Sequence, residues 1–158
     1  MNVSITIYKE KKEQNFRMVI LPSGKNKIGL GKYKDYGIIS YLNKKNAKKI
    51  GELIFWALSE SDNKKIEDEV NVQWYKKYFS CSSNLKVVNE YNNIGFKLFE
   101  NKYIIYLKMK DGRGYSPFKD ENGNMVEYTF PEKPTPLELG TKVMEMFEYK
   151  ERYDGLIE

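Results

Sequence analysis

Residues 46–61 read NAKKIGELIFWALSES, and this stretch has the clearest helical pattern in the chain. The apolar residues that share one face of this helix are Ile50, Leu53, Ile54, Ala57 and Leu58. Asn43 or Asn46 is expected to cap its N-terminus, because a short polar side chain there can accept a free backbone N–H. The pattern predicts an amphipathic helix that packs its apolar face on a core.

A weaker copy of the same pattern, TPLELGTKVMEMFEYK, occupies residues 135–150. In both copies an aliphatic residue precedes a glycine, as Ile50-Gly51 and Leu139-Gly140. Thr135 is expected to cap the second helix and Glu138, three residues later, to complete a capping box. The repeat favours an internal duplication.

Trp56 does not fit the apolar face of the first helix. At 100° per residue it projects to the side that also carries Lys49 and Glu52. Trp56 is therefore expected either to be covered by another part of the chain or to contact a partner.

Alternating and β-branched residues predict strands at 2–8, 16–22, 37–41, 94–100, 102–109 and 126–130. Between them the sequence predicts a charged turn at 9–15, loops at 22–37 and 111–124, a short helix at 72–80 and an irregular segment at 82–93. Each half thus runs strand–strand–strand–helix. Because hairpins make antiparallel sheets, the prediction is a single α+β domain over residues 1–158, with a mostly antiparallel sheet covered by amphipathic helices.

Composition limits the possible functions. The 158 residues include no histidine and a single cysteine, which excludes His-based catalytic triads, most zinc sites and an internal disulfide. No run of about 18 apolar residues predicts a membrane span. The net charge is +5, but residues 1–50 hold 12 basic and 3 acidic residues, whereas the remainder holds 15 and 19. This asymmetry indicates either two differently charged surfaces or a surface that lysines only make soluble.

No motif predicts catalysis, a metal or a cofactor. The glycine-rich stretch at residues 24–32 lacks the Gly-Lys-Ser/Thr ending of a phosphate-binding loop. Without a histidine to activate it, Cys81 is expected to be a small buried residue rather than a nucleophile.

Lysines precede the first helix and form a possible anion-binding group: Lys32, Lys34, Lys44, Lys45, Lys48 and Lys49. Tyrosines lie nearby in sequence, so a small basic nucleic-acid-binding protein is the alternative interpretation. It is the less favoured one, because no known nucleic-acid-binding motif is present.

The order of elements resembles that of contact-dependent growth inhibition immunity proteins. The residues that carry the resemblance are Ile50-Gly51-Glu52-Leu53, Trp74 and Glu138-Leu139-Gly140. The resemblance implies a cytosolic protein without enzymatic activity. Such proteins bind the C-terminal toxin domain of their own large exported effector, often a nuclease, and block its active site or substrate path.

Nuclease toxins present cationic substrate sites, so acidic residues are expected to contact the toxin. The candidates, together with Trp56, are Glu60, Asp62, Glu67, Asp68, Glu69, Asp111, Asp120 and Glu121. The basic first third of the chain has no role in this expectation.

Overall fold

The computed structural model describes residues 2–25, 31–34, 36–62 and 73–157. Within these residues, seven strands form one sheet in the order β5-β2-β1-β6-β7, and β8 and β9 both pair with β7. All the pairings are antiparallel. The strands are β1 Val3–Glu10, β2 Phe16–Leu21, β5 Ile38–Leu42, β6 Tyr91–Phe99, β7 Lys102–Asp111, β8 Gly114–Pro117 and β9 Glu127–Phe130. The predicted α+β fold with a mostly antiparallel sheet is confirmed.

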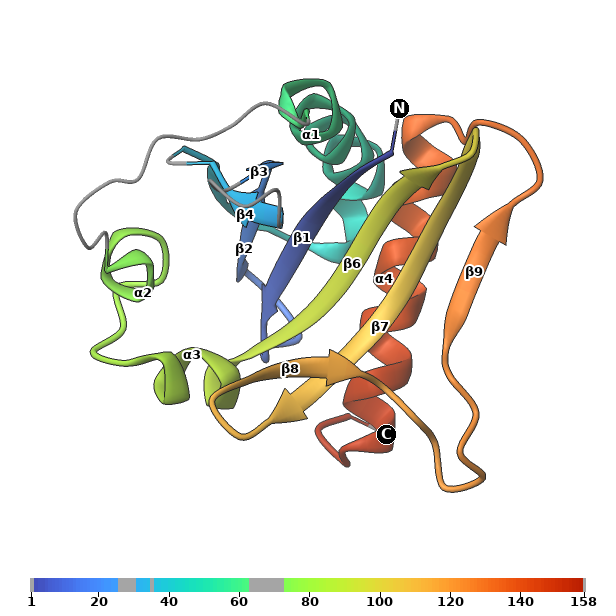
Figure 1. The fold of residues 1–158 in the computed structure, drawn as a ribbon. Helices are drawn as coiled ribbons and strands as arrows, with labels where there is room; N and C mark the ends of the chain where they lie inside the picture. The colour runs from blue at the N-terminus through green and yellow to red at the C-terminus, as the bar shows by residue number, and fades with distance from the viewer. Residues whose placement is uncertain (1, 26–30, 35, 63–72, 158) are drawn as a thin grey trace.

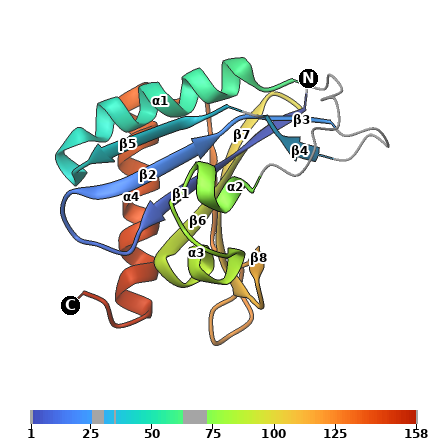
Figure 2. The same ribbon diagram turned by 90° about the vertical axis from the view of Figure 1, so that its left-hand side faces the viewer.

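Two long helices, α1 (Ala47–Glu60) and α4 (Pro136–Tyr153), cover one face of this sheet (Figures 1 and 2). The predicted apolar faces point into the core between helices and sheet, where Ile50, Ile54 and Leu139 have no solvent exposure. Leu53 and Leu58 pack against the edge of the same core. The sheet supplies every second side chain to this core, including Ile94 and Phe96 of β6 and Ile105 and Leu107 of β7.

The two helices cross at the repeated glycines. A Cβ atom on Gly51 would lie 1.8 Å from the carbonyl oxygen of Pro136, and one on Gly140 would lie 1.7 Å from that of Ala47. Pro136 and Ala47 each stand four residues before the glycine of their own helix. The contact therefore has the same form from both sides. The sheet is similar, since β1 and β6 pair at the middle, β2 and β5 lie beyond β1, and β7 with β9 lies beyond β6; β8 is additional to the predicted repeat. This arrangement agrees with the predicted strand–strand–strand–helix repeat.

The structure confirms the predicted hairpin between the strands at 94–100 and 102–109 and the predicted capping box of the second helix. The hairpin joins β6 to β7 through Glu100 and Asn101, whose φ angles are 49° and 63°. Positive φ at both positions is what a two-residue turn of type I′ requires. At the start of α4, the Thr135 side chain accepts from Glu138 N at 3.2 Å and the Glu138 side chain accepts from Thr135 N at 3.1 Å, forming the capping box. In α1, the Asn46 side chain accepts from Asn43 N at 2.8 Å instead of capping the helix.

The other face of the sheet carries smaller elements. They are the hairpin of β3 (Ser23–Lys25) and β4 (Gly31–Tyr33) and the short helices α2 (Trp74–Lys77) and α3 (Asn84–Glu90). An aromatic cluster joins them to the sheet, in which the Tyr8 ring meets Phe79 at 4.7 Å and Tyr115 at 5.7 Å between centroids. The predicted short helix at 72–80 corresponds to α2.

Three segments differ from the prediction. The loop expected at 22–37 contains β3 and β4, the irregular segment expected at 82–93 contains α3 and the start of β6, and the loop expected at 111–124 contains β8. Each added element is short, with three to seven residues, so hydrophobic periodicity has too few positions to reveal it. The charged turn expected at 9–15 begins later, because Lys9 and Glu10 belong to β1.

Candidate functional site

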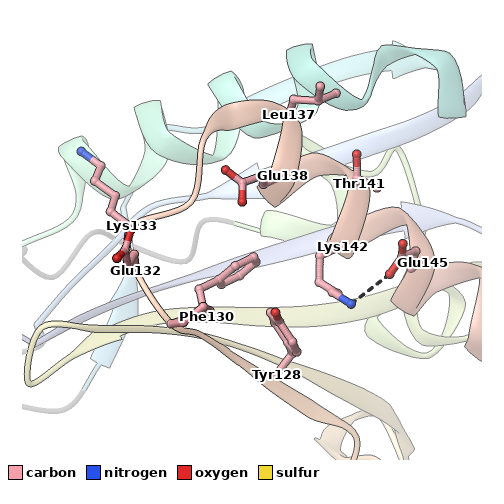
Figure 3. A pocket seen from close by; sticks show the side chains of 10 residues that line it. Tyr128, Phe130, Glu132, Lys133, Leu137, Glu138, Thr141, Lys142 and Glu145 are labelled. Carbon is pink, nitrogen blue, oxygen red and sulfur yellow. Dashed lines mark ion pairs between the residues drawn. The ribbon is translucent and has the colours of Figure 1, made fainter.

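A groove lies between the N-terminal half of α4 and strand β9, with a volume of about 600 Å³ (Figure 3). The α4–β9 groove is lined by Tyr128, Phe130, Pro131, Glu132, Lys133, Leu137, Glu138, Thr141, Lys142 and Glu145. β9 pairs with β7 on one side only, and within the described residues its other edge has no strand partner. The groove is thus bounded by a helix face and by an edge strand.

Aromatic rings form the inner wall of the α4–β9 groove, and charged groups surround them. Tyr128 and Phe130 contact each other edge to face, with ring centroids 4.9 Å apart. The Lys142 ammonium lies 4.3 Å from the Tyr128 ring centroid and 3.0 Å from the Glu145 carboxylate. Figure 3 shows Lys142 reaching from α4 over the Tyr128 ring toward Glu145. Lys142 therefore covers part of an aromatic surface that a partner could contact.

The exposed residues of α4 continue past this groove toward the C-terminus at intervals of four, as Leu137, Thr141, Glu145, Tyr149 and Tyr153. Each of these residues neighbours the next on the helix surface, and the row winds around α4 by about 40° per step. The Tyr149 and Tyr153 rings stack with centroids 6.4 Å apart, and both remain more than a third exposed. Buried Phe118, in the segment between β8 and β9, supports both rings edge to face. Two large aromatic rings are thus held in place while they face solvent.

The predicted acidic residues Asp120 and Glu121 lie beside these tyrosines. The Asp120 carboxylate accepts hydrogen bonds from the backbone N–H groups of Asn122 and Asn124, both at 2.9 Å, which fix the loop. Partial burial and the negative charges of Asp120 and Glu121 raise the pKa of Tyr149. We call Phe118, Asp120, Glu121, Tyr149 and Tyr153 the tyrosine–acid patch.

The α4–β9 groove and the tyrosine–acid patch together form one surface along α4, which we call the α4 face. Its named residues contain five carboxylates and two ammonium groups, a formal charge of −3, or −2 with exposed Lys119 between Phe118 and Asp120, on a protein whose net charge is +5. Exposed tyrosines surrounded by charged groups are typical of protein–protein interfaces. The α4 face is therefore suited to bind a protein surface that is basic.

The other predicted acidic residues lie elsewhere. Asp111 is exposed at the end of β7 beside the turn to β8, and Glu60 is the last residue of α1. Asp62 forms an ion pair with Lys34 at 3.1 Å. The sequence predicts Asp62 among the toxin-binding residues and Lys34 among the anion-binding lysines. Glu67, Asp68 and Glu69 lie outside the described residues.

Trp56 lies on α1, whereas Asp120 and Glu121 lie in the segment between β8 and β9. Its ring meets Tyr36 edge to face, with centroids 6.2 Å apart, and its side chain is 38% exposed. It is thus partly covered by the chain and partly open to solvent. In Figure 1, α4 lies between α1 and the segment that joins β8 to β9. The structure does not bring Trp56 together with Asp120 and Glu121.

The predicted lysine group is divided, with Lys34 near the C-terminal end of α1 and Lys44, Lys45, Lys48 and Lys49 at its start. Lys34 is paired with Asp62, and Lys44 lies 3.9 Å from Glu148 of α4. Lys45, Lys48 and Lys49 are exposed at the start of α1, and the Lys32 side chain lies outside the described part of the chain.

Cys81 is buried, as expected, and its thiol donates to the Glu90 carboxylate at 3.3 Å. Burial, reinforced by Glu90, raises its pKa to about 11, so the thiol is protonated at neutral pH. Among the described side chains no three His, Cys, Asp or Glu residues are grouped to hold a metal ion. In the same part of the chain no helix is both long and apolar enough to cross a membrane.

The aromatic residues of the α4 face are absent from the sequence-based site. Tyr149 and Tyr153 stand one helical turn apart, and neither belongs to the apolar stripe that predicts the core. This spacing of two large rings outside the core stripe is the signal that could have identified them. Tyr128 and Phe118 carry no such signal, because only the fold brings their strand and loop to α4.

Comparison with known proteins gives likenesses of fold. No protein-family model matches the sequence, and no curated protein matches it. Among solved structures, a chain of the CdiA-CT/CdiI toxin and immunity complex from Yersinia pseudotuberculosis superposes with a TM-score of 0.67 at 8% identity. That match covers 94% of this chain and 97% of the other. A protein of unknown function from Neisseria meningitidis gives a TM-score of 0.61 at 10% identity, covering 90% and 93%. The likenesses extend over nearly the whole chain and establish the fold that these proteins share.

Proposed function

We propose that this protein is an immunity protein that binds the toxin domain of a contact-dependent growth inhibition effector and neutralises it. The observation that supports the proposal most is the likeness of fold, over 94% of the chain, to one chain of a toxin and immunity complex. The sequence resemblance carried by Ile50-Gly51 and Leu139-Gly140 points the same way. Both glycines lie at the helix crossing that the fold depends on.

The α4 face is the surface proposed to contact the toxin. A nuclease toxin must bind a polyanion, so its substrate site is cationic and attracts the carboxylates of the α4 face. Asp120 and Glu121 are exposed or partly exposed at one end of this face, and Glu145 is exposed at its middle. Covering the substrate site of the toxin with these carboxylates would exclude its nucleic acid without any chemical step.

The tyrosines supply the affinity in this proposal. A nanomolar complex corresponds to about −12 kcal/mol, and most of such a free energy comes from a few aromatic or arginine anchors. Tyr149 and Tyr153 are held by Phe118 before any partner binds, so little side-chain entropy is lost on contact. The carboxylates would act mainly on the association rate.

A cytosolic location and the absence of enzymatic activity belong to the same proposal. An immunity protein acts where its toxin acts, and it needs only to bind.

The test is binding of the purified protein to the toxin domain encoded directly upstream of its gene, measured by calorimetry. The expected result is a 1:1 complex with nanomolar affinity. Tyr149→Ala/Tyr153→Ala should weaken it by at least a hundredfold. The matched control is Tyr41→Ala, a tyrosine that is 69% exposed on β5. It should change the affinity less than twofold.

Absence of binding by the wild-type protein would contradict the proposal as a whole. A tight complex that Tyr149→Ala/Tyr153→Ala leaves intact would contradict the assignment of the α4 face while keeping the immunity function.

A further inference from the structure

Among the described residues, no helix covers part of β6 and β7 on the sheet face opposite α1 and α4. In Figure 1 the side of these two strands that is turned to the viewer carries no helix, while α4 lies behind them. Cross-strand pairing sets Asn93 beside Lys108 and Gly95 beside Tyr106 on this side. Lys97 is two residues further along β6, so it shares the same side.

Two ammonium groups flank one aromatic ring there. Lys97 Nζ lies 5.3 Å and Lys108 Nζ 5.5 Å from the centroid of Tyr106. The Tyr106 ring lies across Gly95, where a Cβ atom would come within 2.2 Å of the ring carbon that bears the hydroxyl. The glycine thus lets the Tyr106 ring lie between the two lysines, which belong to the cross-strand pairs on either side of Gly95 and Tyr106.

Neither lysine has a counter-charge within the described part of the chain. The ion pairs found there involve other lysines, such as Lys9 with Glu151 and Lys34 with Asp62. Lys97 and Lys108 are nevertheless only partly exposed, and burial lowers the pKa of Lys108. Holding a partly desolvated ammonium without a carboxylate is costly, and a bound anion would remove that cost.

Tyr106 has tyrosine neighbours whose hydroxyl groups are further hydrogen-bond donors in this area. The Tyr33 hydroxyl lies 2.8 Å from that of Tyr8, and it also interacts electrostatically with Tyr106 and Tyr115. Hydroxyl groups can donate to an oxyanion that the ammonium groups attract.

We propose that Lys97, Tyr106 and Lys108 form a binding site for a phosphate group. A phosphate offers several acceptor oxygens and up to two negative charges, which matches two ammonium groups and a neighbouring hydroxyl. The site lies on the sheet face opposite the α4 face and is independent of the immunity function proposed above. The same chemistry serves free phosphate and the backbone of a single-stranded nucleic acid.

The test is a titration of the full chain with inorganic phosphate at constant ionic strength, followed through the backbone amide resonances of Gly95 and Tyr106. Saturable shifts are expected at both. Lys97→Gln/Lys108→Gln should weaken binding at least tenfold and should not lower the thermal midpoint in phosphate-free buffer, because it removes two unpaired charges. The matched control Lys48→Gln/Lys49→Gln removes equal charge from the exposed start of α1 and should change binding less than twofold.

A second titration with octathymidylate separates the two sources of phosphate. If octathymidylate binds more than tenfold more tightly than inorganic phosphate and its affinity falls steeply with salt, the ligand is a nucleic-acid strand. If the two affinities are equal, the ligand is a small anion. Linear shifts without saturation would overturn the proposal. So would binding that survives Lys97→Gln/Lys108→Gln, or that is lost in Lys48→Gln/Lys49→Gln.

Discussion

Gly51 of α1 and Gly140 of α4 lie against each other where the two helices cross, so that a Cβ atom on Gly140 would be 3.1 Å from the backbone nitrogen of Gly51. The same atom would be 1.7 Å from the Ala47 carbonyl oxygen, which is backbone and cannot turn aside. The helices can approach this closely only because both positions lack a side chain. Their separation in turn sets how α4 lies on the sheet and where its exposed face points.

Gly140→Ala is expected to destabilise the fold by about 3 kcal/mol or more, since the helices must move apart and open the core between them. Urea denaturation measures the change. Gly114→Ala is the matched control, because its Cβ would meet no atom closer than 4.0 Å. It should change the free energy of unfolding by less than about 1 kcal/mol. Equal stability of the two variants would contradict the close helix crossing.

Lys9 and Glu151 form a buried ion pair that joins β1 to the C-terminal part of α4. Their side chains are 1% and 4% exposed, and Lys9 Nζ also donates to the Lys12 carbonyl at 2.7 Å. Lys9→Met would leave the Glu151 carboxylate buried and unpaired, so a loss of about 3 to 5 kcal/mol in the free energy of unfolding is expected. Lys9→Met/Glu151→Leu should recover most of it. A double variant no more stable than Lys9→Met would contradict the charge-based explanation.

The Cys81 thiol should be unreactive in the folded protein. Its pKa is raised to about 11, so iodoacetamide at pH 8 should modify it slowly until the protein is unfolded in guanidinium. The folded state keeps this proton at a pH where the unfolded chain has lost it. The contribution of the thiol to the free energy of unfolding is therefore fully present below the pKa of the unfolded thiol. It declines as the pH rises from that value toward 11. Cys81→Ala should show a smaller decline than the wild type over this range, and an unchanged decline would contradict the assignment.

Asp120→Asn/Glu121→Gln is expected to slow association with a basic toxin domain several-fold at low salt, with little effect on dissociation. The difference should shrink at high salt, because exposed charges are screened beyond about 10 Å at 0.1 M. Stopped-flow mixing measures both rates. Glu13→Gln/Glu100→Gln removes two exposed carboxylates outside the α4 face and serves as the control. A salt-independent difference would indicate a structural role for the loop instead of steering.

The sequence was sufficient to predict the main architecture. The helix of residues 46–61, the capping box at Thr135 and the hairpin turn at Asn101 depend on local patterns, and the structure confirms each, with Glu100 also in the turn. Short elements such as α3 have too few residues for such a pattern. Lys9 belongs to a run of charged residues in the sequence, but its pairing with Glu151 depends on a contact 142 residues away.

The candidate site was predictable only in part. Acidic composition singled out Asp120 and Glu121, but many carboxylates share that property, and only the fold shows which of them lie beside exposed aromatic rings. Tyr128 and Phe118 reach the α4 face through strand pairing and loop path. Trp56, an unusual residue on a polar helix side, meets Tyr36 instead. A role for Trp56 in toxin binding remains a prediction that its 38% exposure permits.

The most direct test of the immunity function is growth of bacterial cells that produce the toxin domain encoded directly upstream. Co-production of the wild-type protein should restore growth to the level of toxin-free cells, and Tyr149→Ala/Tyr153→Ala at equal abundance should fail to restore it. Growth that stays arrested although the wild-type protein is folded and abundant would contradict the proposed function.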